Sequence, residues 1–315
     1  RLKRDESCLF IHYNLSGRVG ETYLRRKGTS TPGPLADRMP DKISDISADA
    51  VKAWLSRVSV VRPSQARQAF GVLRACLNWC EEQEKFEGLA NPDSCSTRVS
   101  RNSLPKKKAK SDCLQKEQLS AWFAAVIQLQ NSVISAYLQM LLLTGARRNE
   151  LTGLRWHDID FRWKSLTIKD KVDGERLIPL TPYISYSLSC LPRKSEFVFA
   201  NELSKTGHIV EPRIAHNKAL TIAGIENLPL HGLRRSCGTL SEWVEVPAGI
   251  VAQIQGHKPS ATAEKHYRVR PIDLLRKWHV KIEAWMLEEA GVEFSPSGAV
   301  VGINSIQSLG NVREN

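Results

Sequence analysis

Apolar residues recur three or four positions apart over much of the chain, a spacing that indicates helices with one buried face. Residues 47–58 show this spacing first, with Ser47 as the N-cap and Val51, Trp54 and Leu55 on the apolar side. A second helix is predicted over residues 63–86. Its apolar face comprises Ala66, Phe70, Leu73, Leu77 and either Trp79 or Cys80. The region before residue 97 is therefore predicted to be helical, apart from residues 1–46, whose pattern is less regular. Within them, residues 8–15, "CLFIHYNL", fit either a strand or a helix, and residues 29–34, "TSTPGP", are predicted to form a loop.

The remainder of the chain combines helical patterns with one β-hairpin. The segment "KSLTIKDKVDGERLIPLT", residues 164–181, has two strand-favouring runs on either side of Val172, Asp173 and Gly174. Residues 196–200, "EFVFA", are a candidate short strand. Helices are predicted over residues 114–129, 133–143, 146–154, 213–223, 232–244, 247–255 and 271–290. The predicted fold class is mainly α with a small antiparallel sheet, an α+β fold.

A basic segment suggests where the domains divide. Residues 97–111, "TRVSRNSLPKKKAKS", carry six basic residues and no acid, and they lack hydrophobic periodicity. We predict a linker here between domains at 1–96 and 112–290, in agreement with roughly 150 residues per domain. Residues 291–315 are rich in Gly, Ser and Asn and are predicted to form a flexible tail. The chain does not begin with Met, so an additional domain before Arg1 stays an open question.

The charge balance favours an anionic partner. The 45 Lys and Arg residues outnumber the 33 Asp and Glu residues, giving a net charge of +12. Such a surplus favours nucleic acid, with a merely basic soluble protein as the alternative. The candidate DNA-binding residues of the linker are Arg101, Lys106, Lys107, Lys108 and Lys110, although a solvated linker fits them equally well.

Cysteine usage and hydropathy indicate the compartment. The seven cysteines are irregularly spaced and form no CxxC pair, which favours free thiols in a reducing cytoplasm. The longest apolar run, residues 133–143, is interrupted by Gln139 and is shorter than the ~18 residues of a membrane span. We therefore expect a cytoplasmic protein with no membrane partner.

Five polar residues of the second domain occupy unusual settings. Arg147 follows a buried apolar helix and a Thr-Gly break, and Lys171 stands at the hairpin turn. His231 and Arg234 are spaced i, i+3 and so share a helix face. Shortly after them comes a Gly-His pair. Taken alone, each of these residues fits a surface or structural role.

Their order is far more specific than any one of them. The segments "TGARRNEL", a hairpin lysine, "HGLRRS" and "GHKPSATAEKHY" together resemble the tyrosine recombinases, the family of phage-type integrases. The resemblance covers residues 112–290 strongly and implies a catalytic domain there, preceded by an all-helical core-binding domain. Tyr267 follows His257 by ten residues, whereas many members of the family have nine.

The resemblance implies a chemistry that explains the residue types. Tyr267 would be the nucleophile that attacks a phosphodiester of duplex DNA, although a phenol with a pKa near 10 needs activation. Arg147 and Arg234 would clamp the nonbridging oxygens of the transition state, since guanidiniums are planar and always charged. Lys171 would protonate the leaving 5′ oxygen as a general acid.

The remaining motif positions are implied to assist. His231 would help proton movement at the tyrosine or bind the phosphate, and His257 would donate a hydrogen bond to a nonbridging oxygen. Glu150, one turn after Arg147, matches the acidic position of the family and would orient the site residues. Without the motif, Glu150 would be taken for a surface carboxylate.

The function expected from the resemblance is a site-specific DNA recombinase, an integrase of a prophage or genomic island that works through a 3′-phosphotyrosyl intermediate. No cofactor or metal is expected, because the sequence has neither a GxxxxGK[ST] loop nor clustered carboxylates. The expected partners are double-stranded DNA, three further copies of the chain on that DNA, and accessory DNA-bending or excision factors, with a monomer in solution. The alternatives are a type IB topoisomerase-like nicking-closing enzyme and a non-catalytic DNA-binding protein on the same fold.

Overall fold

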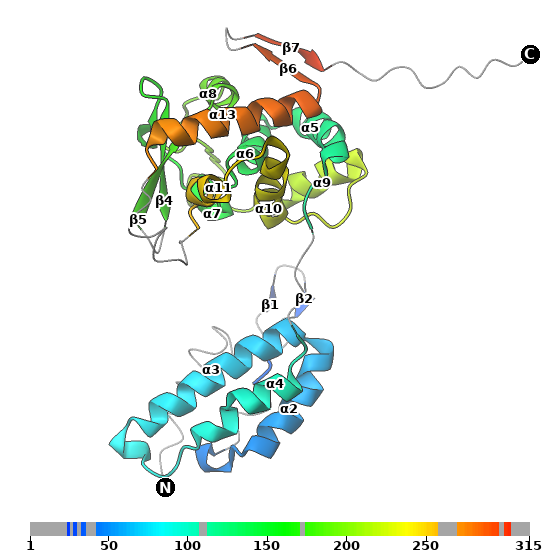
Figure 1. Ribbon diagram of the computed structural model, residues 1–315. Helices are drawn as coiled ribbons and strands as arrows, with labels where there is room; N and C mark the ends of the chain where they lie inside the picture. The colour runs from blue at the N-terminus through cyan, green and yellow to red at the C-terminus, as the bar shows by residue number, and fades with distance from the viewer. Residues whose placement is uncertain are drawn as a thin grey trace, which may run out of the picture. The chain divides into compact units, whose positions relative to one another are not determined.

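The computed structural model describes residues 24–25, 28–29, 33–35, 42–106, 112–170, 174–257, 270–295 and 299–303. The chain divides into two compact units, Arg1–Ala109 and Lys110–Asn315. Both are mainly helical, as Figure 1 shows, and the second contains a small antiparallel sheet. The predicted fold class is therefore confirmed. Within the described residues, no helix has the length and apolar character needed to cross a membrane.

The first unit is built on two long helices, α2 (Ala48–Val61) and α3 (Pro63–Glu81). The Ser47 hydroxyl caps α2 by accepting a hydrogen bond from Ala50 N, as predicted. Val51, Trp54 and Leu55 are buried, which confirms the predicted apolar face. Smaller elements complete the unit: the strands β1 (Leu24–Arg25) and β2 (Gly28–Thr29), the 3-10 turns η2 (Ile43–Asp45), η3 (Glu84–Phe86) and η4 (Pro92–Cys95), and the helix α4 (Thr97–Ser103).

Helix α4 lies inside the segment predicted to be a linker, so the linker prediction is wrong for residues 97–103. Val99 and Leu104 are 4% and 8% exposed and belong to the core of the first unit. A helix of seven residues offers too few apolar positions for its periodicity to be recognised among the basic residues. Residues 107–111 lie outside the described part of the chain.

The other elements of the second unit pack around one central helix, α6 (Ser132–Thr144), which is buried from Ser135 to its end. The elements around it are η5 (Lys116–Gln118), α5 (Leu119–Ile127), α7 (Arg148–Thr152), η6 (Trp156–Asp158), α8 (Pro182–Ser189), α9 (Arg213–Ala223), α10 (Leu230–Ser241), η7 (Glu242–Val244), α11 (Ala248–Gln255) and α13 (Ile272–Glu289). Figure 1 shows α6 between α10 and the long α13.

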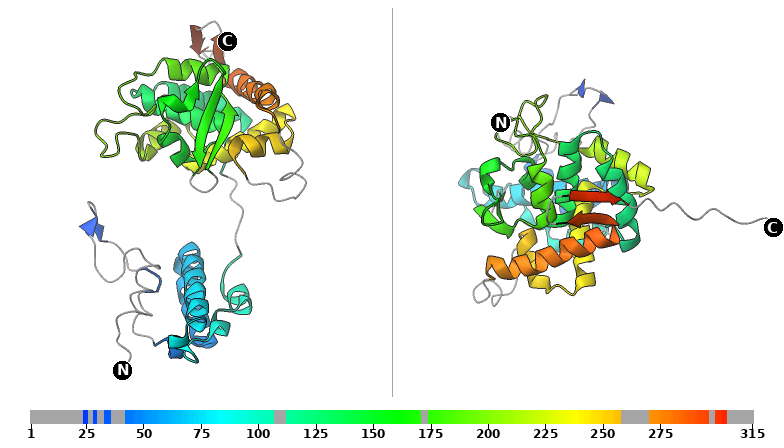
Figure 2. Two further views of the ribbon diagram at one scale, coloured as in Figure 1. Left: turned by 90° about the vertical axis from the view of Figure 1, so that its left-hand side faces the viewer. Right: turned by 90° about the horizontal axis from the view of Figure 1, so that it is seen from above.

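The sheet has the order β3-β4-β5 and is antiparallel throughout. Its strands are β3 (Ile159–Asp160), β4 (Ser165–Asp170) and β5 (Gly174–Pro179), and the last two form the predicted hairpin. The left view of Figure 2 shows these strands along one side of the unit, in front of the helices. Residues 196–200, predicted to be a strand, form only isolated bridges, Arg155 with Phe197 and Ala200 with His208.

The beginning of the predicted C-terminal tail is also structured. Strands β6 (Val292–Ser295) and β7 (Ala299–Ile303) pair in antiparallel fashion next to α13, as the right view of Figure 2 shows. Val292 is 5% exposed, and the Phe294 ring packs edge-on against Tyr183 of α8. The prediction of a flexible tail is therefore wrong for these residues, because Val292 and Phe294 supply apolar contacts that the Gly- and Ser-rich composition obscured.

Candidate active site

Arg147 stands at a tight reversal between α6 and α7. Gly145 ends α6 in the left-handed conformation, with φ of 59°, and Thr144 Oγ1 accepts a hydrogen bond from Ala146 N at 3.2 Å. Arg147 is the N-cap of α7, and both its backbone N–H and its Nη1 donate to the Glu150 carboxylate, at 2.8 and 2.6 Å. The Glu150 side chain is 6% exposed and that of Arg147 is 42% exposed. The carboxylate is thus buried, while the guanidinium that it holds is accessible to an anion.

A second guanidinium, that of Arg176 on β5, binds the same carboxylate. Arg176 Nη1 and Nη2 donate to Glu150 Oε1 and Oε2 at 3.1 and 2.7 Å, and Arg176 Nε donates to the Ile254 carbonyl of α11 at 3.2 Å. Burial alone would raise the pKa of Glu150, but the hydrogen bonds from Arg176 and Arg147 outweigh it and hold that pKa below its ordinary value. The hairpin, α7 and α11 are thus joined through one ionised carboxylate.

Arg234 on α10 is 5% exposed and is held by backbone carbonyls. Its Nη1 donates to Gly145 O and to Gln255 O, both at 2.7 Å, while Gln255 Nε2 donates to Arg234 O at 3.0 Å. Burial, followed by the charge of Arg147, lowers the pKa of Arg234 to about 10, so the guanidinium is charged at neutral pH. The ends of α6 and α11 therefore fix the direction of this side chain.

Two histidines lie near these guanidiniums. His231 is in the first turn of α10, on the face of Arg234, and His257 follows Gly256, the left-handed residue that ends α11. Arg147 Nη2 donates to the Gly256 carbonyl at 3.2 Å, which ties the two segments together. Burial lowers the pKa of each histidine, and the guanidiniums of Arg234 and Arg147 are among the charges that lower it further. Neutral imidazoles are therefore favoured at pH 7.

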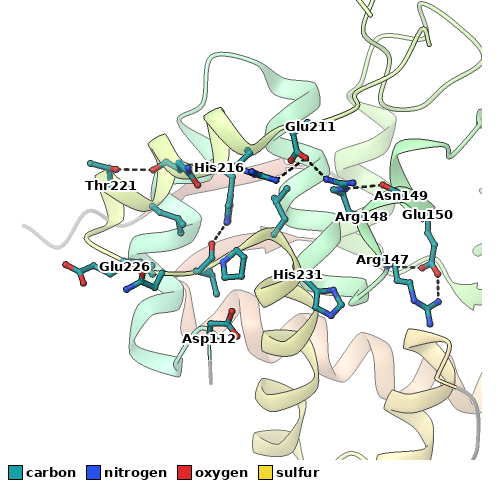
Figure 3. Close-up of a pocket in the computed structure, with 18 of the residues that line it drawn as sticks. Asp112, Arg147, Arg148, Asn149, Glu150, Glu211, His216, Thr221, Glu226 and His231 are labelled. Carbon is teal, nitrogen blue, oxygen red and sulfur yellow. Dashed lines mark hydrogen bonds and ion pairs between the residues drawn. The ribbon is translucent and has the colours of Figure 1, made fainter. Parts of the chain in front are cut away.

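A hollow of about 1610 Å³ opens beside these residues, and Arg147, His231 and His257 are part of its wall. Figure 3 shows Arg147, Glu150 and His231 toward one end of it, and Thr221 and Glu226 toward the other. Polar side chains thus converge on an open surface large enough for an extended ligand.

Four of the sequence-predicted catalytic residues, Arg147, His231, Arg234 and His257, are brought together in this way, and Glu150 lies beneath Arg147. Lys171 and Tyr267 lie outside the described residues. Among the candidate DNA-binding residues, Arg101 and Lys106 are exposed on the first unit, while Lys107, Lys108 and Lys110 are outside the described part.

The sequence analysis missed two residues of this network, Arg176 and Gln255. Arg176 had a detectable signal, because it lies two residues before the buried Ile178 and so points to the same face of β5. Gln255 had none, since its contacts with Arg234 are made across 21 positions of the sequence. These residues come into contact only in the folded chain.

The fold and the site first define a class: a mainly helical domain in which guanidiniums and imidazoles face one open hollow, preceded by a small helical unit. Comparison with known sequences then fixes the family. Residues 2–102 match the phage integrase core-binding domain, and residues 112–270 match the phage integrase family. The chain therefore belongs to the phage integrase family, the tyrosine recombinases.

Individual relatives agree with this assignment. Prophage integrase IntF of Escherichia coli (strain K12) is 52% identical over 302 residues, which are 93% of this chain and 65% of that protein. The chain thus spans slightly less than two thirds of the length of this relative.

Solved structures show the same fold at low identity. The Tn1549 transposon integrase in complex with transposon right end DNA is 16% identical, with a TM-score of 0.56 over 88% of this chain and 98% of that one. A lambda integrase tetramer bound to a Holliday junction is also 16% identical, with a TM-score of 0.54 over 73% of this chain and 68% of that one.

Proposed function

We propose that this chain is a site-specific DNA recombinase, an integrase of a prophage or genomic island, which cleaves and rejoins DNA through a 3′-phosphotyrosyl intermediate. The observation that carries the proposal is that Arg147, His231 and His257, from three separate segments, line one hollow, while the buried guanidinium of Arg234 lies close enough to act on both imidazoles. Two fixed positive charges and two neutral imidazoles suit a reaction in which negative charge grows on the oxygens of a phosphodiester.

The proposed cleavage step balances without a cofactor. The phenol oxygen of Tyr267 forms a bond to phosphorus, and its proton passes to His231. The bond from phosphorus to the 5′ oxygen breaks, and that oxygen takes a proton from Lys171. One phosphoester replaces another, so attack by a different 5′-hydroxyl reverses the step and joins the strands without ATP.

Charge placement supplies the remainder of the catalysis. Arg147 and Arg234 bind the nonbridging oxygens, and His257 donates a further hydrogen bond to one of them. Glu150 keeps Arg147 in place without cancelling the positive charge of the site, because Arg176 also shares its carboxylate. Removing one such donor commonly lowers a rate by roughly 10²–10³-fold.

The partners proposed are duplex DNA at attachment sites and three further copies of the chain on that DNA, with a monomer in solution and accessory DNA-bending or excision factors. The net charge of +12 supports a polyanionic partner. The solved lambda integrase relative is a tetramer on a Holliday junction, which supports four copies here. A cytoplasmic location is proposed from the unpaired cysteines of the described residues.

Covalent trapping tests the proposal. The protein is incubated with fragments of the genome from which it comes, the reaction is stopped with detergent, and DNA that stays attached to protein is recovered and sequenced at the attached end. We expect one cleaved bond, with protein on its 3′ phosphate, and no adduct for the Tyr267→Phe variant, which lacks only the attacking oxygen.

Each other outcome identifies an alternative. An adduct that persists in Tyr267→Phe would refute the nucleophile assignment. Adduct formation at many sequences, with relaxation of supercoils but no resolution of a four-way junction, would indicate a nicking-closing enzyme. Tight binding to DNA with no adduct at any sequence would indicate a non-catalytic DNA-binding protein.

A further inference from the structure

The first described residues of the second unit are fastened to α10. Asp112 Oδ1 lies 2.6 Å from Nη2 of Arg235, and the two side chains are 18% and 27% exposed. Leu114 N donates to Ser236 Oγ at 2.7 Å, and this hydroxyl donates in turn to Gly232 O at 2.9 Å. An ion pair and a hydrogen bond therefore bind consecutive parts of this segment to consecutive residues of the helix.

Gly232 permits this close contact. A Cβ at this position would lie 2.8 Å from the backbone oxygen of Asp112, a distance that real Cβ atoms essentially never show, and 2.6 Å from Leu228 Cδ1. The glycine between His231 and Arg234 is thus required by packing against the residue that precedes the helix. The position of Asp112 and that of the first turn of α10 are consequently linked.

Asp112 and His231 both line the hollow beside the first turn of α10 (Figure 3), and the Asp112 carboxylate acts electrostatically on the imidazole. The charged and titratable groups that act on this imidazole are Arg235 and Arg234 of its own helix, Arg147 before α7, His257 after α11, and Asp112. Asp112 is the one acid among these groups within the described residues. Burial lowers the pKa of His231 most, the guanidiniums lower it further, and the carboxylate of Asp112 opposes them.

The contact between Asp112 and Arg235 is Coulombic more than directional. Asp112 Oδ1 is buried, and no well-aligned hydrogen bond from the described residues reaches it, despite the short distance to Arg235 Nη2. The carboxylate charge acts on the Arg235 guanidinium, 2.6 Å away, and also on the imidazole of His231.

We propose that Asp112 is a positioning residue for His231, which holds the first turn of α10 through Arg235 and offsets the surrounding guanidiniums so that the imidazole can accept the tyrosine proton. This inference rests on the proposed function, in which His231 takes that proton. The three guanidiniums of Arg235, Arg234 and Arg147 without a counter-charge would make the imidazole a weaker base, and the rate of proton transfer follows basicity.

The test measures the rate of covalent adduct formation on the mapped cleavage site as a function of pH, between about pH 5 and pH 8. The variants are Asp112→Asn, which removes the charge and keeps the shape, and Asp112→Glu, which keeps the charge. The matched control is Glu288→Gln, which removes one negative charge from an exposed residue of α13 that does not line the hollow. Thermal unfolding of each variant monitors the fold.

The expected result is specific in direction. In Asp112→Asn the acidic limb of the profile moves to lower pH, because the imidazole loses its proton more easily, and the plateau rate falls by roughly three- to tenfold. Asp112→Glu restores the position of the limb, and Glu288→Gln leaves both features unchanged.

The outcomes separate this inference from the function on which it rests. A lower rate with an unmoved acidic limb, or an Asp112→Asn protein that matches the parent, overturns the inference while leaving the recombinase assignment intact. If Asp112→Asn does not fold, the Asp112→Glu variant provides the test. An acidic limb at the same pH as in the parent supports the role of the carboxylate charge, and a displaced limb contradicts that role. Failure of the parent protein to form any adduct would instead reject the proposed function.

Discussion

Arg176 and Glu150 form a bidentate ion pair. Arg176 Nη1 donates a hydrogen bond to Glu150 Oε1 at 3.1 Å, and Arg176 Nη2 donates one to Glu150 Oε2 at 2.7 Å. The arginine side chain is 15% exposed and the carboxylate side chain 6% exposed. Arg147 binds the same carboxylate through its backbone N–H and its Nη1. Because the carboxylate lies between the hairpin and the reversal that carries Arg147, its loss would free both elements at once.

We expect Arg176→Gln to destabilise the second unit by about 3 kcal/mol or more, because it leaves a buried carboxylate with one of its two positive partners missing. The double variant with Glu150→Gln should cost less than the sum of the two single variants. A coupling energy of about 1–3 kcal/mol is expected for contacting residues in one network. Urea unfolding of the four proteins of this double-mutant cycle measures it.

The control for this cycle is the pair of Arg148 and Glu211, whose ion pair is 39% and 37% exposed. Exposed pairs contribute less than about 1 kcal/mol, so the same substitutions there should show little coupling. Equal coupling energies for the two pairs would mean that burial of the Glu150 carboxylate is not what matters.

Much of the fold could be predicted from the sequence because long helices repeat their pattern. Helix α3 shows both the strength and the limit of this signal. Its apolar face was predicted through Leu77, with Trp79 or Cys80 to follow; the structure buries Cys80, at 2% exposed, and leaves Trp79 39% exposed. The helical period continues from Leu77 to position 80, whereas the Trp79 ring, one position earlier, lies at the edge of the core, with its centroid 5.9 Å from that of Phe86.

Short elements and contacts between distant segments could not be predicted in this way. The helix α4 has one apolar residue and the strand β6 has two, so neither shows a hydrophobic pattern that stands out from the polar residues around it. The site motifs named Arg147 and Arg234 but not the groups that aim them. Gly145 O and Gln255 hold Arg234 through contacts that exist only after α6, α10 and α11 have packed.

Gly145→Ala should damage both stability and cleavage. Gly145 has φ of 59°, where an L side chain costs roughly 1–2 kcal/mol, and the new Cβ would lie 2.5 Å from Nε2 of Gln255. Overpacking of this kind adds about 1–3 kcal/mol. Because Gly145 O and Gln255 O both hold Arg234, we expect the rate of adduct formation to fall as well.

Gly224→Ala isolates the contact from the backbone strain. Gly224 ends α9 with φ of 66°, and a Cβ there would meet nothing within 4 Å. Its alanine variant should lose only the smaller, conformational part of the stability and keep the parent rate of cleavage. Thermal unfolding and adduct formation for both variants make the comparison. Equal losses would show that the Gln255 contact is unimportant.

Glu283 should make the free energy of unfolding decrease as pH rises, which is the opposite of the trend given by an ion-paired surface carboxylate. Its side chain is 2% exposed and caps the start of α8, accepting hydrogen bonds from Thr181 Oγ1 and from the backbone of Tyr183 and Ile184. Burial raises the pKa of Glu283 to about 7, whereas an unfolded glutamate titrates near about 4.3. Between these values the folded state holds a proton that the unfolded state has released, so stability falls as pH rises through that window.

Glu283→Gln should flatten this dependence, even though the amide lowers the overall stability by accepting fewer hydrogen bonds. The measurement is the unfolding temperature between about pH 4.3 and pH 7, the window bounded by the two pKa values. Glu288→Gln, on the exposed side of the same helix, is the control and should keep the slope of the parent. A slope that is unchanged in Glu283→Gln would show that another group titrates.

Replacing Arg101 and Lys106 should reduce the salt dependence of DNA binding. Each phosphate contact releases counterions, so the logarithm of the binding constant falls with the logarithm of salt concentration by about 0.9 per contact. If both exposed residues contact phosphates, the Arg101→Gln, Lys106→Gln double variant should lower the magnitude of that slope by about 1.8. Fluorescence anisotropy with one duplex at several salt concentrations measures this slope.

The control is Lys52→Gln, at a lysine that pairs with Asp49 on α2. This variant removes one positive charge from the same unit and should keep the parent slope. A double variant that binds more weakly at every salt concentration with an unchanged slope would mean that these residues act on the fold of the first unit and not on phosphate, since only the loss of an ionic contact alters the number of counterions released.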